Sequence, residues 1–129
     1  MYSRGGSPVK LMSCILLVDD DPQFRRTLHL ALSSHNHEVI EAADGREALE
    51  LMASSTPDVV VLDWHLPKLS GIDTCRAVRA GSDVPIIMIS ANRANSKTAA
   101  VEAGANDYLA KPFSLNALLT HIESTLKHS

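Results

Sequence analysis

Two short runs of apolar residues in this chain are each followed at once by acidic residues. Ile15–Val18 leads into three aspartates at 19–21, and Val59–Leu62 leads into Asp63. Four consecutive apolar residues leave no polar face, which is typical of a strand covered on both sides in a parallel sheet. In open α/β sheets the ligand crevice lies beyond the carboxyl ends of the strands. The two acidic strand ends are therefore candidates for one binding site.

The remaining pattern repeats a strand followed by an amphipathic helix five times. Right-handed crossovers between such units require a parallel sheet with helices on both faces. The first, third and fourth strands are the most apolar and should be central, which favours a flavodoxin-like (βα)5 doubly wound α/β fold with strand order 2-1-3-4-5. The predicted strands cover residues 14–18, 38–42, 58–63, 85–89 and 107–110, and the helices begin near Pro22, Asp44, Gly71, Asn95 and Ser114.

Local signals support these boundaries. Asp21 stands directly before Pro22, so we interpret it as a helix cap rather than a ligand. Asp44 and Glu47 have the spacing of a capping box, and Gly104 is a predicted helix C-cap.

Length and composition limit the classes of function. A chain of 129 residues fits one domain, which we place at 14–129 after a flexible N-terminal lead-in at 1–13. The net charge of −3 and the interspersed charges disfavour direct nucleic-acid binding. No apolar run is long enough to span a membrane or to form a signal peptide, so we expect a soluble, cytoplasmic protein. Cys14 and Cys75 have neither metal-pair nor disulfide spacing, and we interpret both as buried, reduced thiols.

The acidic residues predict a cation site. Parallel strands place their carboxyl ends at one edge, so Asp63 should face Asp19 and Asp20 across a few ångströms. Crowded carboxylates repel one another unless a cation or protons offset the charge. Oxygen ligands without a nearby His or Cys favour Mg²⁺. Taken alone, Asp63 is equally well explained as a turn residue that bonds its own backbone.

Several motifs follow one another along the chain, each at a predicted strand end or in the loop that follows: Val18-Asp19-Asp20, Leu62-Asp63, Pro67 with Gly71, Ser90-Ala91, and Tyr108 three residues before Lys111-Pro112. Together these motifs resemble those of a known family, the receiver domains of two-component response regulators. The resemblance covers Cys14 to about Lys127 and implies a phosphoacceptor signalling domain that catalyses only its own phosphorylation and dephosphorylation.

The resemblance implies a role for each matching residue. Asp63 matches the phosphoacceptor. Asp20 and Asp63 would bind Mg²⁺ directly, Asp19 would act through water, and the backbone carbonyl of His65 would complete the protein ligands. The oxygens of the phosphoryl group would be bound by the Lys111 ammonium, the Ser90 hydroxyl and the Ala91 backbone amide.

Other positions would tune or transmit the signal. Ser90 and Tyr108 match the switch residues, although Tyr108 is also explained as an ordinary strand residue. His65 and Asn92 would flank the path of a hydrolytic water and tune the acyl-phosphate lifetime. We expect Trp64 to anchor its loop and the other histidines to face solvent.

The implied partners are a sensor histidine kinase or phosphotransfer protein, and an effector or output domain on the surface of the fourth helix, fifth strand and fifth helix. That surface would also serve a phosphorylation-dependent homodimer, although His121 and Ser124 replace the basic residues usual in the winged-helix subclass. A haloacid-dehalogenase type phosphohydrolase needs a second Asp where this chain has His65. A phosphorylation-dead pseudo-receiver is disfavoured by the intact set of Asp19, Asp20, Asp63, Ser90 and Lys111.

Overall fold

A computed structural model describes residues 12–91 and 96–127 of the chain. It confirms five alternating strand and helix units. In chain order the elements are β1 (Ser13–Val18), α1 (Pro22–Ser33), β2 (His37–Ala42), α2 (Gly45–Ser54), β3 (Val59–Asp63), α3 (Gly71–Gly81), β4 (Ile86–Ser90), α4 (Ser96–Glu102), β5 (Asp107–Ala110) and α5 (Leu115–Lys127).

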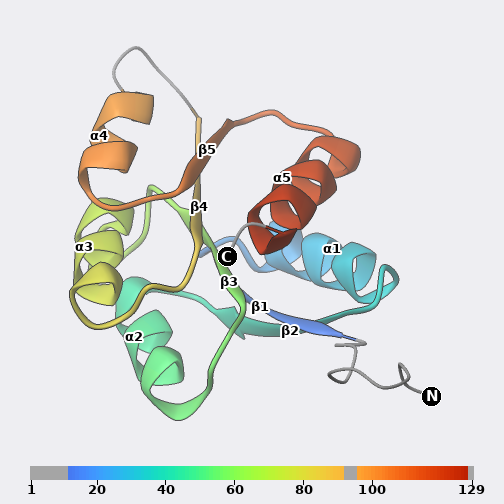
Figure 1. Cartoon of the computed structure of the whole chain (residues 1–129), viewed down its shortest axis with the longest axis horizontal. Coiled ribbons are helices and arrows are strands. Elements are labelled where there is room, and N and C mark those ends of the chain that lie inside the picture. Colours follow the sequence, from blue (N-terminus) through green and yellow to red (C-terminus); the bar gives the residue numbers. More distant parts are fainter. Residues whose placement is uncertain (1–11, 92–95, 128–129) are drawn as a thin grey trace.

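The five strands form one parallel sheet in the order β2-β1-β3-β4-β5, as the sequence predicts (Figure 1). In the register of β1 against β3, Val18 lies beside Leu62. Asp19 follows Val18 and Asp63 follows Leu62, so the two aspartates lie at the same level of the sheet. From β1 the chain continues to β2 on one side, and it then returns to β3 on the other side. The ligand crevice of this fold forms at that switch point, between β1 and β3.

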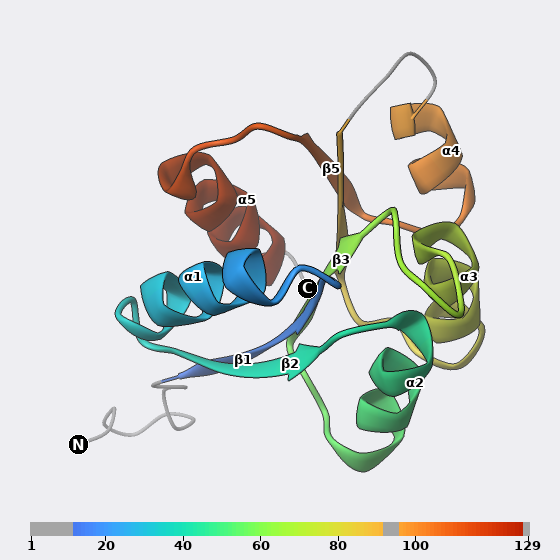
Figure 2. The same ribbon diagram turned by 180° about the vertical axis from the view of Figure 1, so that it is seen from behind.

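Helices cover both faces of the sheet, with α1 and α5 on one side and α2, α3 and α4 on the other (Figures 1 and 2). Successive side chains of a strand point to opposite faces. Leu16 of β1 thus packs in the cluster that includes Cys75 of α3 and Ala100 of α4. Its neighbour Ile15 packs with Leu32 of α1 and Leu118 of α5. The central strands are fully buried because both faces are covered.

Polar side chains fix the starts of the helices. The Asp21 carboxylate accepts hydrogen bonds from the backbone amides of Gln23 and Phe24, which confirms it as the cap of α1. Asp44 caps α2 in the same way through the amide of Glu47. These caps satisfy backbone donors that have no partner inside the helix.

The structure corrects several details of the prediction. β1 begins at Ser13, inside the predicted lead-in, while residues 1–11 and the predicted helix start at Asn95 lie outside the described residues. The expectation that the remaining histidines face solvent is wrong for His37, which is 7% exposed on edge strand β2. Burial lowers the pKa of His37 below its ordinary value. Alternation along β2 places this side chain on a covered face, whereas the expectation rested on the absence of metal-ligand spacing, which does not bear on burial.

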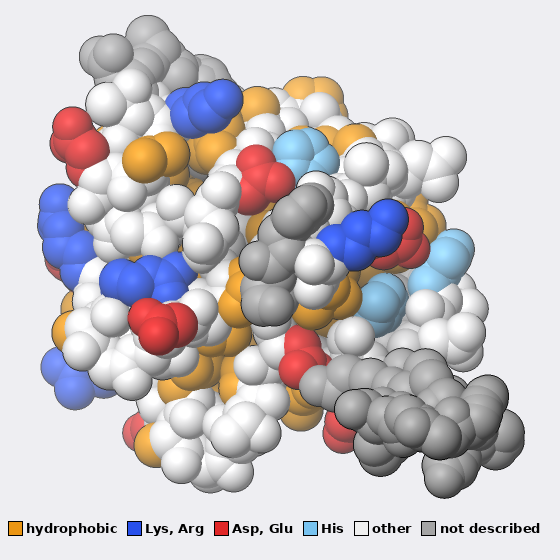
Figure 3. Space-filling view, viewed as in Figure 1, with side chains coloured by type: hydrophobic (Ala, Val, Ile, Leu, Met, Phe, Trp, Pro, Cys, Tyr) orange, Lys and Arg blue, Asp and Glu red, His pale blue; other side chains and the backbone are white. Residues whose placement is uncertain are grey.

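The burial of the cysteines and the distribution of surface charge can be compared with the expectations from composition. Cys75 is buried as predicted, whereas Cys14 is only partly buried. Acidic and basic side chains are interspersed on the face drawn in Figure 3, and neither sign gathers there. Among the described residues, no helix is long and apolar enough to cross a membrane.

Candidate functional site

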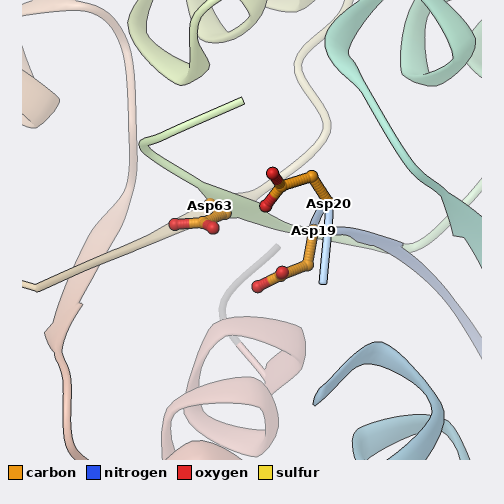
Figure 4. Close-up of side chains that lie close together, drawn as sticks. All are labelled: Asp19, Asp20 and Asp63. Carbon is orange, nitrogen blue, oxygen red and sulfur yellow. The ribbon is translucent and has the colours of Figure 1, made fainter. Parts of the chain in front are cut away.

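The ends of β1 and β3 bring together the three predicted acidic residues, Asp19, Asp20 and Asp63 (Figure 4). Each offers a carboxylate oxygen, and these oxygens all lie within 4.8 Å of one another. Asp19 and Asp63 are only 1% and 4% exposed, whereas Asp20 is exposed to solvent. The site therefore has a buried floor of two carboxylates and one carboxylate at its mouth.

Two hydrogen bonds to the backbone hold Asp19 in place. Its backbone amide donates to the carbonyl of Ala42, and its Oδ1 accepts from the amide of Asp21 at 2.9 Å. Its Oδ2 is buried and has no hydrogen-bond partner among the described residues. Burial, reinforced by the charge of Asp63, raises the pKa of Asp19 to about 6. The Asp21 amide and Lys111 oppose this rise but do not cancel it.

Lys111 places a cation between the two buried carboxylates. Its Nζ lies 3.5 Å from Asp63 Oδ2 and 3.7 Å from Asp19 Oδ2. The ammonium also lies 4.9 Å from the centre of the Phe24 ring, a favourable arrangement for a cation over an aromatic face. In the part of the chain that the structure describes, Lys111 is the only side chain in an ion pair with Asp19 or Asp63.

Ser90 ends the neighbouring strand β4 and is 3% exposed, and Ala91 follows it at the surface. The Ser90 carbonyl accepts the backbone amide of Lys111 at 2.6 Å, so the ends of β4 and β5 are joined. Tyr108 pairs in register with Met88, two residues before Ser90. Ser90 and Tyr108 therefore lie on the same face of the sheet. The Tyr108 hydroxyl is buried there without a hydrogen-bond partner among the described residues.

The loop after Asp63 lies against the acidic site. The His65 amide points to Asp63 Oδ1 at 3.4 Å, and its side chain is exposed. Trp64 is partly buried against the core, as predicted for an anchor. Gly71 is required here because a Cβ would meet the Asp63 carbonyl oxygen at 2.2 Å. The other predicted lifetime residue, Asn92, lies outside the described residues.

A chain of polar contacts behind the site was not found from the sequence. Arg25 donates to the backbone carbonyl of Asp19 and to the carboxylate of Glu41, whose other oxygen contacts His29. Partial burial opposes ionisation of Glu41, but the hydrogen bonds from Arg25 and His29 outweigh it, so its pKa lies below the ordinary value. The available signal was the position of Arg25 in the first turn of α1, because long helical side chains point back toward the helix start.

The donor set fits Mg²⁺. It consists of hard oxygen atoms, and the buried Asp19 Oδ2 has no hydrogen bond to satisfy it among the described residues. Asp20 also lines a groove with His65, Pro67 and Ser70, which opens the site to solvent. An exposed carboxylate beside two buried ones suits a cation that keeps part of its water shell.

A parallel sheet in this order, with an acidic crevice and a lysine directly after β5, is the arrangement that the sequence resemblance predicts for a receiver domain. The model of the response regulator receiver domain family matches residues 15–123. The chain belongs to this family and is the receiver domain of a two-component response regulator.

Similar proteins of known sequence and structure are also response regulators or receiver domains. The chain is 44% identical over 117 residues to the response regulator MprA of Mycolicibacterium vanbaalenii, covering 89% of this chain and 51% of that protein. It thus spans about half the length of the curated relatives it matches. The receiver domain of Francisella response regulator 1452 superimposes with a TM-score of 0.86 at 30% identity, over 90% of this chain and 98% of that chain.

A further solved structure that is similar to this chain contains a metal ion. The receiver domain of sensor histidine kinase PA1611 from Pseudomonas aeruginosa PAO1 superimposes with a TM-score of 0.82 at 33% identity, over 89% of this chain and 98% of that one. That structure holds a magnesium ion coordinated in its active site cleft.

Proposed function

We propose that Asp63 of this domain accepts a phosphoryl group from a phosphohistidine of a sensor histidine kinase or phosphotransfer protein. The observation that supports this most directly is the setting of Asp63, a buried carboxylate 3.5 Å from the Lys111 ammonium and beside two further carboxylates. A carboxylate in such a place can attack phosphorus and form an acyl phosphate.

In the transfer, a carboxylate oxygen of Asp63 bonds to phosphorus while the phosphorus–nitrogen bond of the donor imidazole breaks. The electron pair stays on the imidazole nitrogen, which takes up a proton from water. Such reactions depend mainly on positioning and on stabilising charge at the peripheral oxygens. The Lys111 ammonium, the Ser90 hydroxyl and the Ala91 amide bind those oxygens in our proposal.

Mg²⁺ is the proposed cofactor. Asp20 and Asp63 would bind it directly, Asp19 through a water molecule, and the His65 backbone carbonyl would complete the protein ligands. Bound there, the ion would screen the approach of two anions to each other. Backbone amides hold the two buried carboxylates in place, that of Asp21 at Asp19 and that of His65 at Asp63, and Asp20 remains exposed at the mouth.

The direct test uses the purified domain, a small phosphodonor such as acetyl phosphate, and Mg²⁺. We expect the intact mass to rise by one phosphoryl group and the adduct to fail to form when the metal is chelated. A domain that gains no phosphoryl group from either a phosphohistidine donor or a small donor would be a pseudo-receiver.

The competing enzyme, a haloacid-dehalogenase type phosphohydrolase, has no support here. Its general acid would be an aspartate two residues after the nucleophile, and that position is His65, an exposed loop residue. The receiver family to which the chain belongs is a family of signalling domains. We therefore propose that turnover is limited to the domain's own phosphorylation and dephosphorylation.

The lifetime of the acyl phosphate should depend on His65 and Asn92. We expect His65→Ala and Asn92→Ala each to change the dephosphorylation half-life, because both side chains would flank the path of the attacking water. Folding should be unaffected in the His65 variant, since its side chain is exposed. The measurement is loss of the phosphoryl mass after the donor is removed. An unchanged half-life in the double variant contradicts this role.

Phosphorylation should move the surface of α4, β5 and α5. A phosphoryl group on Asp63 adds charge and acceptors that can draw the Ser90 hydroxyl toward it. Ser90 shares its face of the sheet with Tyr108 and α4, and in α4 only Ala100 is fully buried among the described residues. Little packing therefore resists a rearrangement of Tyr108 and α4.

Amide NMR with beryllofluoride, a phosphoryl mimic, measures this switch. We expect shifts from the acidic loops through α4, β5 and into α5, and Ser90→Ala should weaken the remote shifts while leaving Asp63 able to accept phosphate. Ser54→Ala, at an exposed position of α2, is the control and should leave them unchanged. Shifts confined to the loops around Asp63 would disprove the mechanism.

The same surface is the proposed contact for an effector, an output domain or a second copy of the chain. A partner that reads the switch must bind the phosphorylated domain more tightly than the unphosphorylated one. We propose that this signalling takes place in the cytoplasm, without direct nucleic-acid or membrane binding by the domain itself.

A further inference from the structure

The contacts of Arg25 join three elements behind Asp19 and Asp20, here called the acidic pair. Its NH1 group donates to the Asp19 backbone carbonyl at 2.7 Å, and its Nε donates to Glu41 Oε1 at 2.6 Å. The other Glu41 oxygen contacts His29 Nδ1 at 2.5 Å. Arg25 and His29 lie one turn apart on α1, while Glu41 lies near the end of β2. The guanidinium therefore connects the end of β1 to both neighbouring elements.

The backbone of Asp19 is clamped by these contacts. Its amide donates to Ala42, the residue after Glu41, and its carbonyl accepts from Arg25. That carbonyl belongs to the peptide plane shared with Asp20. Fixing that plane fixes the position of the Asp20 Cα, because the plane contains it, and so limits where the Asp20 carboxylate can lie. Because Asp20 is exposed, its position depends on the backbone rather than on side-chain packing.

We infer that Arg25 is a positioning residue for the metal-binding acidic pair, and that Glu41 and His29 hold its guanidinium in place. Arg25 acts through the Asp19 carbonyl and does not contact the reacting group. Its side chain is 17% exposed and that of Glu41 is 24% exposed, so both contacts are largely shielded from water. This inference rests on the proposed function, because it concerns the proposed Mg²⁺ site.

Charge and orientation predict opposite effects when Arg25 is replaced. Removing a cation near a cation site should, by Coulomb interaction alone, strengthen Mg²⁺ binding. Loss of the clamp should instead weaken it, because residues that orient metal ligands typically contribute about tenfold or more to affinity. The sign of the change therefore separates a positioning role from a purely electrostatic one.

The experiment compares Arg25→Met with Arg26→Met. The two variants lose the same charge from adjacent positions, but Arg26 is exposed on the outer side of α1. Mg²⁺ is titrated while the fluorescence of Trp64, the one tryptophan in the chain and next to Asp63, is recorded. Amide NMR of Asp20 gives a second readout, and thermal unfolding confirms that each variant is folded.

We expect the dissociation constant for Mg²⁺ to rise about tenfold in Arg25→Met. In Arg26→Met it should stay equal to that of the original chain or fall slightly. Arg25→Lys keeps the charge, but an ammonium cannot bridge both acceptors with a planar fork, so its affinity should also fall. If Arg25→Met does not fold, Arg25→Lys decides the question.

Two failures can be told apart. If the original chain does not bind Mg²⁺, the metal site of the proposed function is wrong. If the original chain binds Mg²⁺ but both Arg25 variants bind it as tightly as Arg26→Met, only the positioning role is wrong.

Discussion

Asp63→Asn should abolish stable phosphorylation of this domain. The amide of asparagine lacks the nucleophilic carboxylate oxygen that would bond to phosphorus. The variant should remain folded, because the change preserves shape and removes one of three crowded negative charges. Intact mass after treatment with a phosphodonor and Mg²⁺ should show the adduct in the original chain and none in the variant.

The matched control is Asp21→Asn. Asp21 adjoins the acidic pair, but its carboxylate caps α1, and asparagine is an equally good cap. This variant should accept phosphate as the original chain does. A full-stoichiometry adduct on Asp63→Asn, or loss of the adduct in Asp21→Asn, would contradict the assignment of Asp63.

Strand composition explains why the fold and the acidic cluster were predictable. Val59–Leu62 is apolar at every position, which favours a strand covered on both faces, and the most apolar strands are expected at the centre of the sheet. In a parallel sheet the last residues of adjacent strands must share an edge. The convergence of Asp19 and Asp63 follows from this register, which the structure bears out.

Contacts that depend on side-chain direction were not predictable in the same way. Arg25 reaches the Asp19 carbonyl and Glu41, which belongs to an edge strand sixteen residues further along the chain. His37 is buried although the absence of metal-ligand spacing led us to expect a solvent-facing residue. The Arg25 contacts do not follow from periodicity, because they depend on how α1 packs across the end of the sheet. The burial of His37 follows the alternation along β2, but the strand begins at His37 and not at Glu38 as predicted.

Asp19→Asn should make the domain more stable and less able to bind Mg²⁺. Burial and the charge of Asp63 disfavour ionisation of Asp19, and its pKa rises to about 6 from an ordinary 3.8. A rise of that size corresponds to roughly 3 kcal/mol of unfolding free energy lost when Asp19 is ionised, taken as an upper bound. Asparagine avoids this penalty and can still accept the Asp21 amide hydrogen bond through its side-chain oxygen.

The sign of the pH dependence follows from the raised pKa. Between about pH 4 and pH 6 the folded state binds more protons than the unfolded state, so protonated Asp19 favours folding at the acidic end. This contribution is lost as the pH rises through about 6. The stability advantage of Asp19→Asn should therefore be largest at pH 7 and above, and should vanish near pH 4.

Denaturant unfolding at several pH values, with and without Mg²⁺, tests this prediction. In metal-free buffer at neutral pH, Asp19→Asn should unfold at a higher denaturant concentration than the original chain. Added Mg²⁺ should narrow or reverse the difference, because a ligand that binds only the folded state stabilises more strongly the chain to which it binds more tightly. Asp20→Asn, at the exposed acid, should gain much less stability in metal-free buffer. Equal or lower stability of Asp19→Asn at neutral pH would show that the buried pair carries no electrostatic strain. If the prediction holds, ionised Asp19 lowers the stability of the free domain, and the cation that the pair binds restores it.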